Sequence, residues 1–291
     1  MMTHLLKTVA LLAVCLLGAA ATQAQDTEAN VAITLERTAC FGACPVYTIT
    51  ILEDGTVLYN GERFVEVTGE QTSEIDPATV DMLVEAFADA GYFEWEEAYD
   101  QQTITDLPTI ITSVTRDGET HRITRYAGDS NAPLALPFLE TWIDEAVNTQ
   151  MWTGVLPDVG TISNGMDTPV ATLQRTQCFG MCPIYQAALF ADGTVVYLGV
   201  ANVDHIGVHI YETDADVVES VVHRAALSGY FDWEDSYEDA LITDQSSVIT
   251  SVRTDDGYKR IVRYLGDPNA PVGLVWVEDS IDHLVTSLAG E

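Results

Sequence analysis

The chain has 291 residues, of which 45 are Asp or Glu and only 12 are Lys or Arg, so its formal charge is −33. A surface this acidic repels polyanions and argues against binding to nucleic acid or to anionic membranes. With 47% hydrophobic and 20% charged residues, the composition is that of a globular protein, and the length leaves room for two domains with separate cores.

The first residues have the pattern of a signal peptide, which we place at 1–24. Lys7 precedes an apolar run at 9–17, and Thr22-Gln23-Ala24 forms a small-residue cleavage site. The run is too short to span a bilayer, and Val14 before Cys15 is unsuited to lipoprotein processing. We therefore expect a secreted or periplasmic protein with no integral membrane segment after the signal peptide is removed.

One sequence occurs twice in the chain. Residues 37–47, RTACFGACPVY, return 138 positions later at 175–185 as RTQCFGMCPIY. The Asp-Gly-Thr-Val segment at 54–57 and the Gly-Tyr-Phe segment at 91–93 return with the same displacement. A period this long indicates two copies of a complete domain rather than a solenoid repeat. We assign repeat 1 to 31–148, a linker to 149–168 and repeat 2 to 169–289.

In the first part of repeat 1, alternating apolar residues predict strands at 31–35 and 46–52. A turn at 53–55 predicts a hairpin whose second strand begins at Thr56, and residues 63–67 could add another strand. Asp76 and Pro77 are typical of a helix start, and Gly91 of a helix end. The aromatic segment at 92–95 is expected to pack this helix against the sheet.

The second part of repeat 1 predicts another hairpin, formed by residues 109–116 and 121–126, and then a second helix carrying apolar residues from Leu136 to Val147. The order strands, helix, strands, helix predicts an α+β fold, with an antiparallel sheet and two helices in each of two homologous tandem domains. The short linker suggests that the domains lie side by side, and sheets joined about a pseudo-twofold axis are one possible arrangement.

The cysteines of the mature chain occur as one pair in each repeat. In an exported protein this predicts the disulfides Cys40–Cys44 and Cys178–Cys182, because each copy then closes its own bond. Residues i and i+4 of a strand are ~13 Å apart, whereas a disulfide needs Cα atoms within about 7 Å. The segment must therefore fold back as a tight loop, and we expect its central glycine to adopt a positive φ.

The motif Cys-Phe-Gly-x-Cys-Pro-x-Tyr, the Asp-Gly-Thr-Val hairpin, the Gly-Tyr-Phe segment and the step at Thr105-Asp106 resemble the domain-of-unknown-function family numbered 6438. That family consists mostly of exported bacterial proteins. The resemblance covers both repeats and implies no activity, cofactor or catalytic residue. A tandem copy departs from the single domain expected of the family.

The Cys-x3-Cys-Pro pattern also resembles the copper motif of Sco-type chaperones, and thiolates are suitable ligands for Cu(I). In those proteins the motif lies between a strand and a helix, whereas here strands are predicted on both sides. No histidine recurs in register, and His205 and His209 should be too far apart on a strand to share an ion. Copper or thiol-redox chemistry is therefore the alternative function, and its ligands would be Cys40, Cys44, Cys178 and Cys182.

Basic residues are few, yet several recur in both repeats together with acidic ones. Two interpretations follow: structural Arg–carboxylate pairs that fix loops, or an anion pocket near the cysteine loop built on Arg37 and Arg175. The candidate residues are Arg37, Arg125, Asp106, Arg175, Arg263 and Asp244. No nucleophile–base set and no cofactor motif is present, so the sequence predicts no catalytic residue and no cofactor. It indicates an exported, non-enzymatic binding or structural module whose ligand and partner it does not identify.

Overall fold

The computed structural model describes residues 30–101, 106–155, 157–162, 168–239 and 244–290. The predicted signal peptide, Cys15 and Thr105 lie outside these residues. Among the helices that the structure describes, none is long and apolar enough to cross a membrane.

In repeat 1, seven strands form one sheet in the order β4-β3-β2-β1-β6-β7-β5. Neighbouring strands are antiparallel, except that β5 runs parallel to β7. The strands are β1 (Val31–Arg37), β2 (Val46–Leu52), β3 (Thr56–Arg63), β4 (Gly69–Glu74), β5 (Ala98–Tyr99), β6 (Thr109–Arg116) and β7 (Glu119–Tyr126). The α+β class and the order of elements are confirmed, while the short parallel strand β5 was not predicted.

The strand predicted at 63–67 is wrong. Strand β3 runs on to Arg63, and the chain then turns at Phe64, whose φ is 55°. A left-handed residue interrupts the extended backbone, so the fourth strand forms only from Gly69 onwards. Val67 instead donates its main-chain N–H to the carbonyl of Trp152, at 2.8 Å.

Two helices cover one face of this sheet: α1 (Pro77–Asp89) and α2 (Ala135–Ala146). Asp76 caps α1 as predicted, because its side chain accepts a hydrogen bond from the N–H of Ala78 at 2.9 Å. Gly91, with a φ of 91°, follows the end of the helix. A single helical turn, η1 (Tyr92–Glu94), then buries Tyr92 completely.

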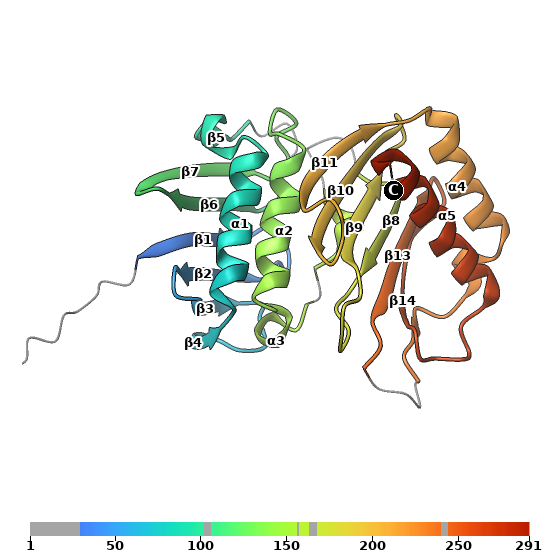
Figure 1. The fold of residues 1–291 in the computed structure, drawn as a ribbon, viewed down its shortest axis with the longest axis horizontal. Helices are drawn as coiled ribbons and strands as arrows, with labels where there is room; N and C mark the ends of the chain where they lie inside the picture. The colour runs from blue at the N-terminus through green and yellow to red at the C-terminus, as the bar shows by residue number, and fades with distance from the viewer. Residues whose placement is uncertain (1–29, 102–105, 156, 163–167, 240–243, 291) are drawn as a thin grey trace, which may run out of the picture.

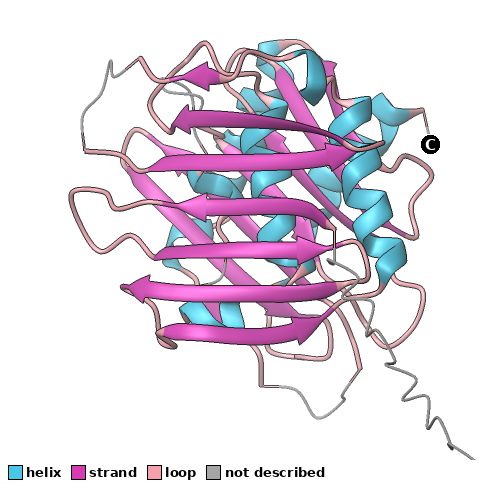
Figure 2. Ribbon diagram, turned by 90° about the vertical axis from the view of Figure 1, so that its left-hand side faces the viewer, coloured by secondary structure: helices cyan, strands magenta, loops and turns pink. Residues whose placement is uncertain are grey.

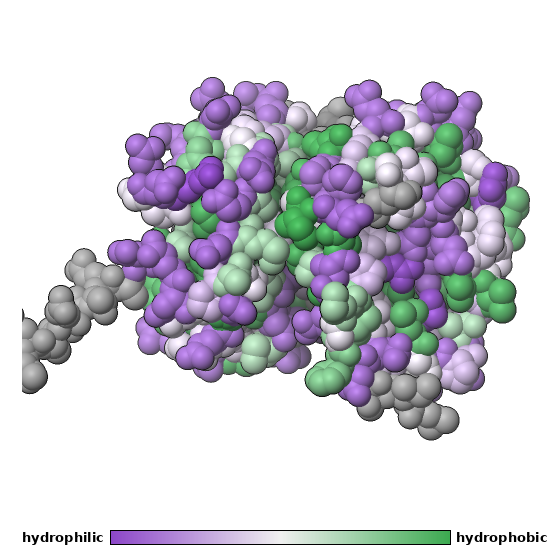
Figure 3. Space-filling model, viewed as in Figure 1, coloured by the Kyte–Doolittle hydropathy of each residue, from purple (hydrophilic) through white to green (hydrophobic). Residues whose placement is uncertain are grey.

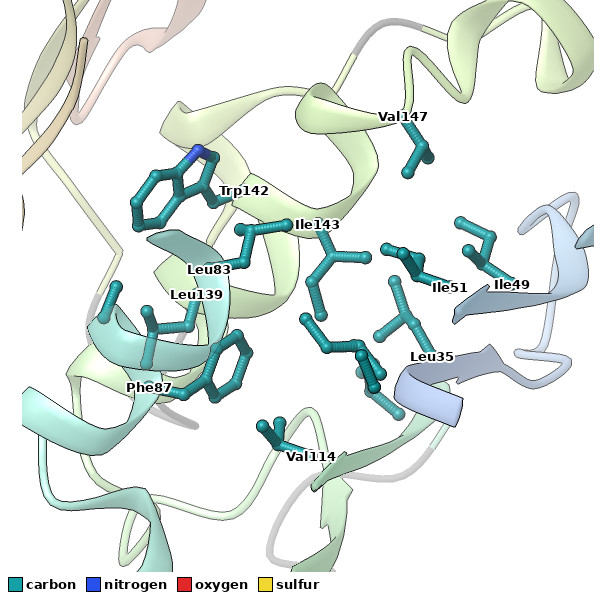
Figure 4. Packing of buried hydrophobic residues seen from close by; sticks show 14 of the residues in the cluster. Leu35, Ile49, Ile51, Leu83, Phe87, Val114, Leu139, Trp142, Ile143 and Val147 are labelled. Carbon is teal, nitrogen blue, oxygen red and sulfur yellow. The ribbon is translucent and has the colours of Figure 1, made fainter. Parts of the chain in front are cut away.

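The core of repeat 1 lies between the sheet and the two helices (Figure 4). Residues from the two sides point toward one another and are fully buried; they include Leu35, Ile49 and Ile51 from the strands and Leu83, Phe87, Leu139 and Ile143 from the helices. Each buried side chain of this size contributes about 1.5–3 kcal/mol through the hydrophobic effect.

Repeat 2 has the same plan, with the strand order β11-β10-β9-β8-β13-β14-β12. Its strands are β8 (Ala171–Arg175), β9 (Ile184–Leu189), β10 (Thr194–Ala201), β11 (Gly207–Glu212), β12 (Ser236–Tyr237), β13 (Ser247–Thr254) and β14 (Gly257–Tyr264). Its helices are α4 (Ala215–Leu227), the short turn η3 (Tyr230–Asp232) and α5 (Val272–Ala289). Helix α5 is therefore longer than its counterpart α2.

The two repeats stack in four layers, and their sheets stay separate (Figure 1). Helices α1 and α2 lie between the two sheets, and α4 and α5 cover the far face of the second sheet. Figure 2 shows the open face of the first sheet, with strands of the second crossing behind it. The arrangement with joined sheets and a twofold axis is therefore wrong, because a twofold axis would bring identical surfaces together, whereas here helices meet a sheet.

Apolar side chains account for this stacking. Phe138 of α2 is fully buried in a cluster with Ala188 and Val196 from the second sheet and with Phe190, which follows β9. Leu198 of β10 joins the core of the first repeat. In Figure 3 most of the visible surface is hydrophilic, and hydrophobic residues gather where the repeats meet. Burial of these side chains favours the layered contact over an arrangement of sheets joined edge to edge.

The segment between the repeats is attached to both of them. It contains a short helix α3 (Gln150–Thr153) and a single turn η2 (Val159–Thr161). Trp152 enters the first core and stacks on Tyr59, with ring centroids 4.7 Å apart. On the other side, Tyr258 donates to the carboxylate of Asp158 at 2.7 Å.

Candidate functional site

A charged cluster lies where strand β1 ends beside helix α2. Arg37, the last residue of β1, donates from Nε and Nη2 to Oδ2 of Asp144, at 2.9 and 2.6 Å. The hydroxyl of Tyr47 donates to the other carboxylate oxygen at 2.6 Å. Burial alone would lower the pKa of Arg37, but the charges of its neighbours, Asp144 first among them, and its hydrogen bond to Asp144 together outweigh burial and raise this pKa. Burial and the same carboxylate raise the pKa of Tyr47, which remains a neutral donor.

A second ion pair lies one helical turn away. Arg125 on β7 donates from Nε to both oxygens of Glu140, at 3.1 and 3.2 Å, and its Nη2 also bonds this carboxylate. Both side chains are almost completely buried, with 4% and 1% of their surface exposed. The two pairs are connected, since Arg37 also donates to the main-chain oxygen of Glu140 at 3.4 Å.

Arg125 retains one donor without an acceptor. Among the described residues, its Nη1 is buried and has no hydrogen-bond partner. A buried, unpaired donor costs about 1–3 kcal/mol, more when the group is charged.

Repeat 2 contains the same cluster. Arg175 and Tyr185 both donate to the carboxylate of Asp282, and Arg263 pairs with Glu278. This copy is more exposed, because 19% of the Asp282 side chain is accessible compared with 3% for Asp144.

The acidic partners of the arginines differ from the candidates that the sequence suggested. Asp106 and Asp244 instead use their main-chain oxygens, which accept from the N–H groups of Phe41 and Phe179 at 3.0 and 3.1 Å. Both aspartates have a positive φ, 80° and 76°, and so shape the turn that holds the cysteine loop. The structure therefore places both aspartates at the cysteine loops.

The true partners could have been found in the sequence. Glu140 and Asp144 recur in repeat 2 as Glu278 and Asp282, with the same spacing of 138 residues. They are four residues apart, so both face the same side of their helix. Recurring acidic residues on the buried side of an apolar helix are the signal that sequence reasoning missed.

Another recurrent aspartate fixes a loop. Asp129 accepts from the N–H groups of Gln101 and Asn131, both at 2.9 Å, and Asp267 holds the corresponding loop of repeat 2. Burial would raise the pKa of Asp129, but these hydrogen bonds outweigh it and lower this pKa.

Each cysteine loop is closed by a disulfide. Cys40 is bonded to Cys44 and Cys178 to Cys182, with Cα atoms 5.7 and 5.8 Å apart. Sulfurs joined in this way are not available as thiolates, so nothing in the structure favours the copper alternative. The described residues also contain no group of three or more metal-ligating side chains.

Two expectations about these regions are corrected. Gly180 has a φ of 153°, but Gly42 is not among the residues with positive φ, so only the second loop requires its glycine. The rings of His205 and His209 are closer than predicted, 5.6 Å between centroids. The reason is that β11 begins at Gly207, so the two histidines do not lie on one strand.

A cavity of about 480 Å³ opens beside the first ion-pair cluster. Its polar lining includes the ion-pair cluster and several further polar side chains: Arg37, Tyr47, Arg125, Glu140, Asp144, Thr141, Thr149, Thr153, Asp158 and Thr161. Its apolar walls include Pro45 from the cysteine loop, Leu107 and Pro108 before β6, and Val155, Pro157 and Ile162 from the segment between the repeats. This volume is in the range of small-molecule binding sites.

The pattern that defines a domain of unknown function, DUF6438, matches residues 31–147 and again residues 169–285. The chain is a tandem member of this family. A comparison with curated proteins finds no match. The family confirms the resemblance that the cysteine motif suggested, and it assigns no activity to the cavity or to the ion pairs.

A carboxyl group is buried where the repeats meet. Glu145 of α2 accepts hydrogen bonds from the side chains of Gln174 and Gln186 in the second sheet. Burial and, to a smaller extent, the charge of the neighbouring Asp144 raise the pKa of Glu145 to about 8, in spite of these two hydrogen bonds. The contact between the repeats therefore includes a group that titrates near neutral pH.

Proposed function

We propose that this protein is an exported, non-enzymatic binding module that holds a small molecule in the cavity of its first repeat. The observation that carries the proposal is the cavity itself, in which a disulfide-closed loop, a buried ion-pair cluster and the segment between the repeats meet. Apolar walls combined with a few convergent polar groups are typical of ligand sites.

The construction of the site supports binding rather than catalysis. Four of the charged groups that line the cavity form ion pairs with one another: Arg37 with Asp144 and Arg125 with Glu140. Both carboxylates already accept hydrogen bonds from the arginines, so they are held in place as structural partners. The cluster instead gives the cavity a rigid polar wall.

Export is supported by two features: the signal-peptide pattern of residues 1–24 and the disulfide in each repeat. Disulfides persist in oxidising compartments such as the periplasm or the extracellular space.

The experiment is native mass spectrometry of the protein purified from an oxidising compartment, combined with a thermal-shift screen of neutral small molecules. The critical variant is Val155→Trp, which places a large ring at the cavity wall on a residue that is 51% exposed and tolerates the change. The matched control is Val272→Trp on α5, where the valine is 86% exposed and far from the cavity wall. We expect bound or stabilising molecules to be lost only from Val155→Trp, and equal binding by both variants would contradict the proposal.

A further inference from the structure

A second cavity, of about 420 Å³, lies where the helices of repeat 1 meet the second sheet. Side chains of α1, α2, β8, β9 and β10 line it, and it shares only Asp144 and Pro157 with the cavity beside the first ion-pair cluster. Its volume is also in the range of small-molecule sites. It is therefore a candidate site separate from the one in the proposed function.

Three charged side chains line this second cavity, and two of them are neutralised within the protein. Arg175 is paired with Asp282, and Asp144 is paired with Arg37. The third is Glu145. When it is ionised, its carboxylate is the one charge of the lining that no cation of the described residues balances.

The partners of Glu145 are neutral. Its two carboxylate oxygens accept from the amides of Gln174 and Gln186, and among the ion pairs of the described residues none includes it. Each oxygen accepts one amide N–H here and so retains a further acceptor site. Glu145 also keeps part of its surface accessible and lines the cavity, so a bound molecule can reach it.

This group belongs to the contact between the repeats and not to the duplicated ion pairs. The position equivalent to Glu145 in repeat 2 is His283. The positions equivalent to Gln174 and Gln186 in repeat 1 are Glu36 and Thr48. The carboxyl group and its two amides therefore meet in one copy only, and no structural ion pair common to both copies accounts for them.

The rest of the polar lining does not select a charge. It consists of hydroxyl and amide side chains, namely Thr79, Asn148, Gln150, Thr176 and Gln177. Such groups both donate and accept hydrogen bonds, so they can solvate polar ligands of either sign. Selection falls to Glu145, and the net charge of −33 attracts cations at long range. A metal ion fits poorly, because the described residues contain no group of three or more metal-ligating side chains.

We propose that this second cavity binds a small organic cation, such as a guanidinium or a primary ammonium, whose N–H groups donate to the carboxylate of Glu145. The apolar part of the molecule lies against Met82, Ile184 and Val200. On binding, the cation takes the place of the carboxyl proton. The O–H bond of Glu145 breaks, the proton passes to the solvent, and the carboxylate remains paired with the ligand.

The test uses three probes that share a butyl chain: butylguanidinium, a cation; butylurea, its neutral analogue of similar shape; and pentanoate, an anion. Isothermal titration calorimetry of the full-length protein at pH 8.5 measures their affinities. We expect butylguanidinium to bind at least about tenfold more tightly than butylurea, because hydrogen bonds between ionised groups are stronger than those between neutral ones. Pentanoate should not bind.

A second readout follows the proton. Burial and Asp144 raise the pKa of Glu145 to about 8, so at pH 7 butylguanidinium should release close to one proton for each molecule bound. The measured enthalpy should then change with the ionisation enthalpy of the buffer. The apparent affinity should rise about tenfold from pH 6 to pH 7 and level off near pH 9. The other charged groups that face the cavity, Asp144 and Arg175, are held in their ion pairs.

Glu145→Gln removes the negative charge and keeps the shape of the side chain. It should reduce the affinity for butylguanidinium to that for butylurea and abolish both the proton release and the pH dependence. Asp279→Asn is the matched control, because it removes a carboxylate from α5, outside this cavity, and should leave all three affinities unchanged.

A blocking variant locates the binding site. Gln177→Trp places a large ring at the cavity on an exposed residue, and it should abolish binding of butylguanidinium. Ala39→Trp makes the same change at the equivalent, exposed position of repeat 1, which does not line the cavity, and it should not affect binding.

Equal affinities for butylguanidinium and butylurea, binding without proton release, or an unchanged affinity in Glu145→Gln would each overturn the proposal. Binding that survives Gln177→Trp also overturns it, because the cation is then held elsewhere on the acidic surface. Tightest binding of pentanoate overturns it in favour of an anion site on Arg175, the other interpretation of this arginine. If Glu145→Gln fails to fold, the affinity ratio and the proton release of the unmodified protein still decide. Failure here leaves the proposed function standing, because its test depends on Val155, which does not line this cavity.

Discussion

The two repeats have the same fold but opposite surroundings, and their sheets show this most clearly. In the second sheet, the face opposite its own helices is covered by the helices of repeat 1, and there Ala188, Val196 and Leu198 are completely buried. The equivalent positions on the open first sheet are Thr50, Leu58 and Asn60, and Leu58 is 43% exposed. The two copies have therefore diverged on this face of the sheet. These substitutions determine which sheet is covered by the helices of the other copy.

For the helices the order is the opposite: those of repeat 1 are covered by the other repeat, and those of repeat 2 face the solvent. On α2, Phe138 is buried between the repeats, while its counterpart on α5, Trp276, is 42% exposed beside Asp279. In repeat proteins, end units carry polar outer faces that stop further stacking. The polar face of the first sheet, the acidic residues on α5 and the net charge of −33 together favour a stack that ends at two copies.

The candidate site also depends on the tandem arrangement. In repeat 1 the second helix stops at Ala146, and the chain then supplies Val155, Pro157 and Ile162 as one wall of the cavity. In repeat 2 the equivalent helix continues to Ala289. The ion-pair cluster occurs in both repeats. In repeat 1 it lines a ligand-sized cavity, because the segment that joins the repeats adds a further wall there.

The largest effect is expected from a charge placed on the covered sheet. Val196→Asp would bury a carboxylate against α2 without a partner, and it should lower the free energy of unfolding by roughly 4 kcal/mol or more. The matched variant is Leu58→Asp, at the equivalent position of the open sheet, where a change within about 0.5 kcal/mol is expected.

Urea denaturation followed by circular dichroism measures both variants. Similar losses for the two would show that the first sheet is also covered in solution, and the comparison of the repeats would fail.

The next largest effect concerns the ion-pair clusters. Asp144→Ala leaves Arg37 without its buried partner and should cost about 3–5 kcal/mol. Asp282→Ala removes the equivalent carboxylate of repeat 2, which is 19% exposed, so water can partly replace it and the loss should be smaller. The same denaturation experiment compares them, and a larger loss for Asp282→Ala would contradict the assignment of the more buried cluster to repeat 1.

Much of each repeat could be predicted from local chemistry. The alternation in β2, the Asp76 cap and the Asp117-Gly118 hairpin are each determined by neighbouring residues. The partners of Arg37 and Arg125 do not follow from neighbouring residues, because Asp144 and Glu140 lie 107 and 15 positions away on an apolar helix, where only their recurrence in repeat 2 marks them. The stacking of the repeats was missed because it depends on which face of a whole sheet is apolar.

A pH-dependent effect is expected at the contact between the repeats. The folded-state pKa of Glu145 is about 8, above its ordinary value of 4.5. Between these two pH values the folded protein keeps a proton on Glu145 that the unfolded chain has released. Stability from this group is therefore greatest below pH 4.5 and is lost as the pH rises toward 8. Glu145→Gln removes the titration, and it should be more stable than the unmodified protein by about 4 kcal/mol at pH 8.5 and by no more than about 1 kcal/mol at pH 5.

Thermal or urea unfolding at several pH values measures this difference. Asp279→Asn is the control, since it removes an exposed carboxylate from the corresponding helix of repeat 2 and should show no such trend. A difference between Glu145→Gln and the unmodified protein that stays constant with pH would contradict a buried, titrating Glu145.

The smallest effect separates the two cysteine loops. Gly180 has a φ of 153°, which residues with a side chain rarely adopt, and an added Cβ would have only Sγ of Cys178 nearby, at 3.9 Å. The cost of Gly180→Ala is therefore due to the backbone alone and should be about 1 kcal/mol or slightly more. At Gly42 the backbone is not left-handed and an added Cβ would meet Sγ of Cys40 at an ordinary 3.6 Å, so Gly42→Ala should be neutral or slightly stabilising. Urea denaturation under oxidising conditions compares them, and equal losses would show that both loops need a left-handed glycine, which would make the two loops alike in backbone as well as in sequence.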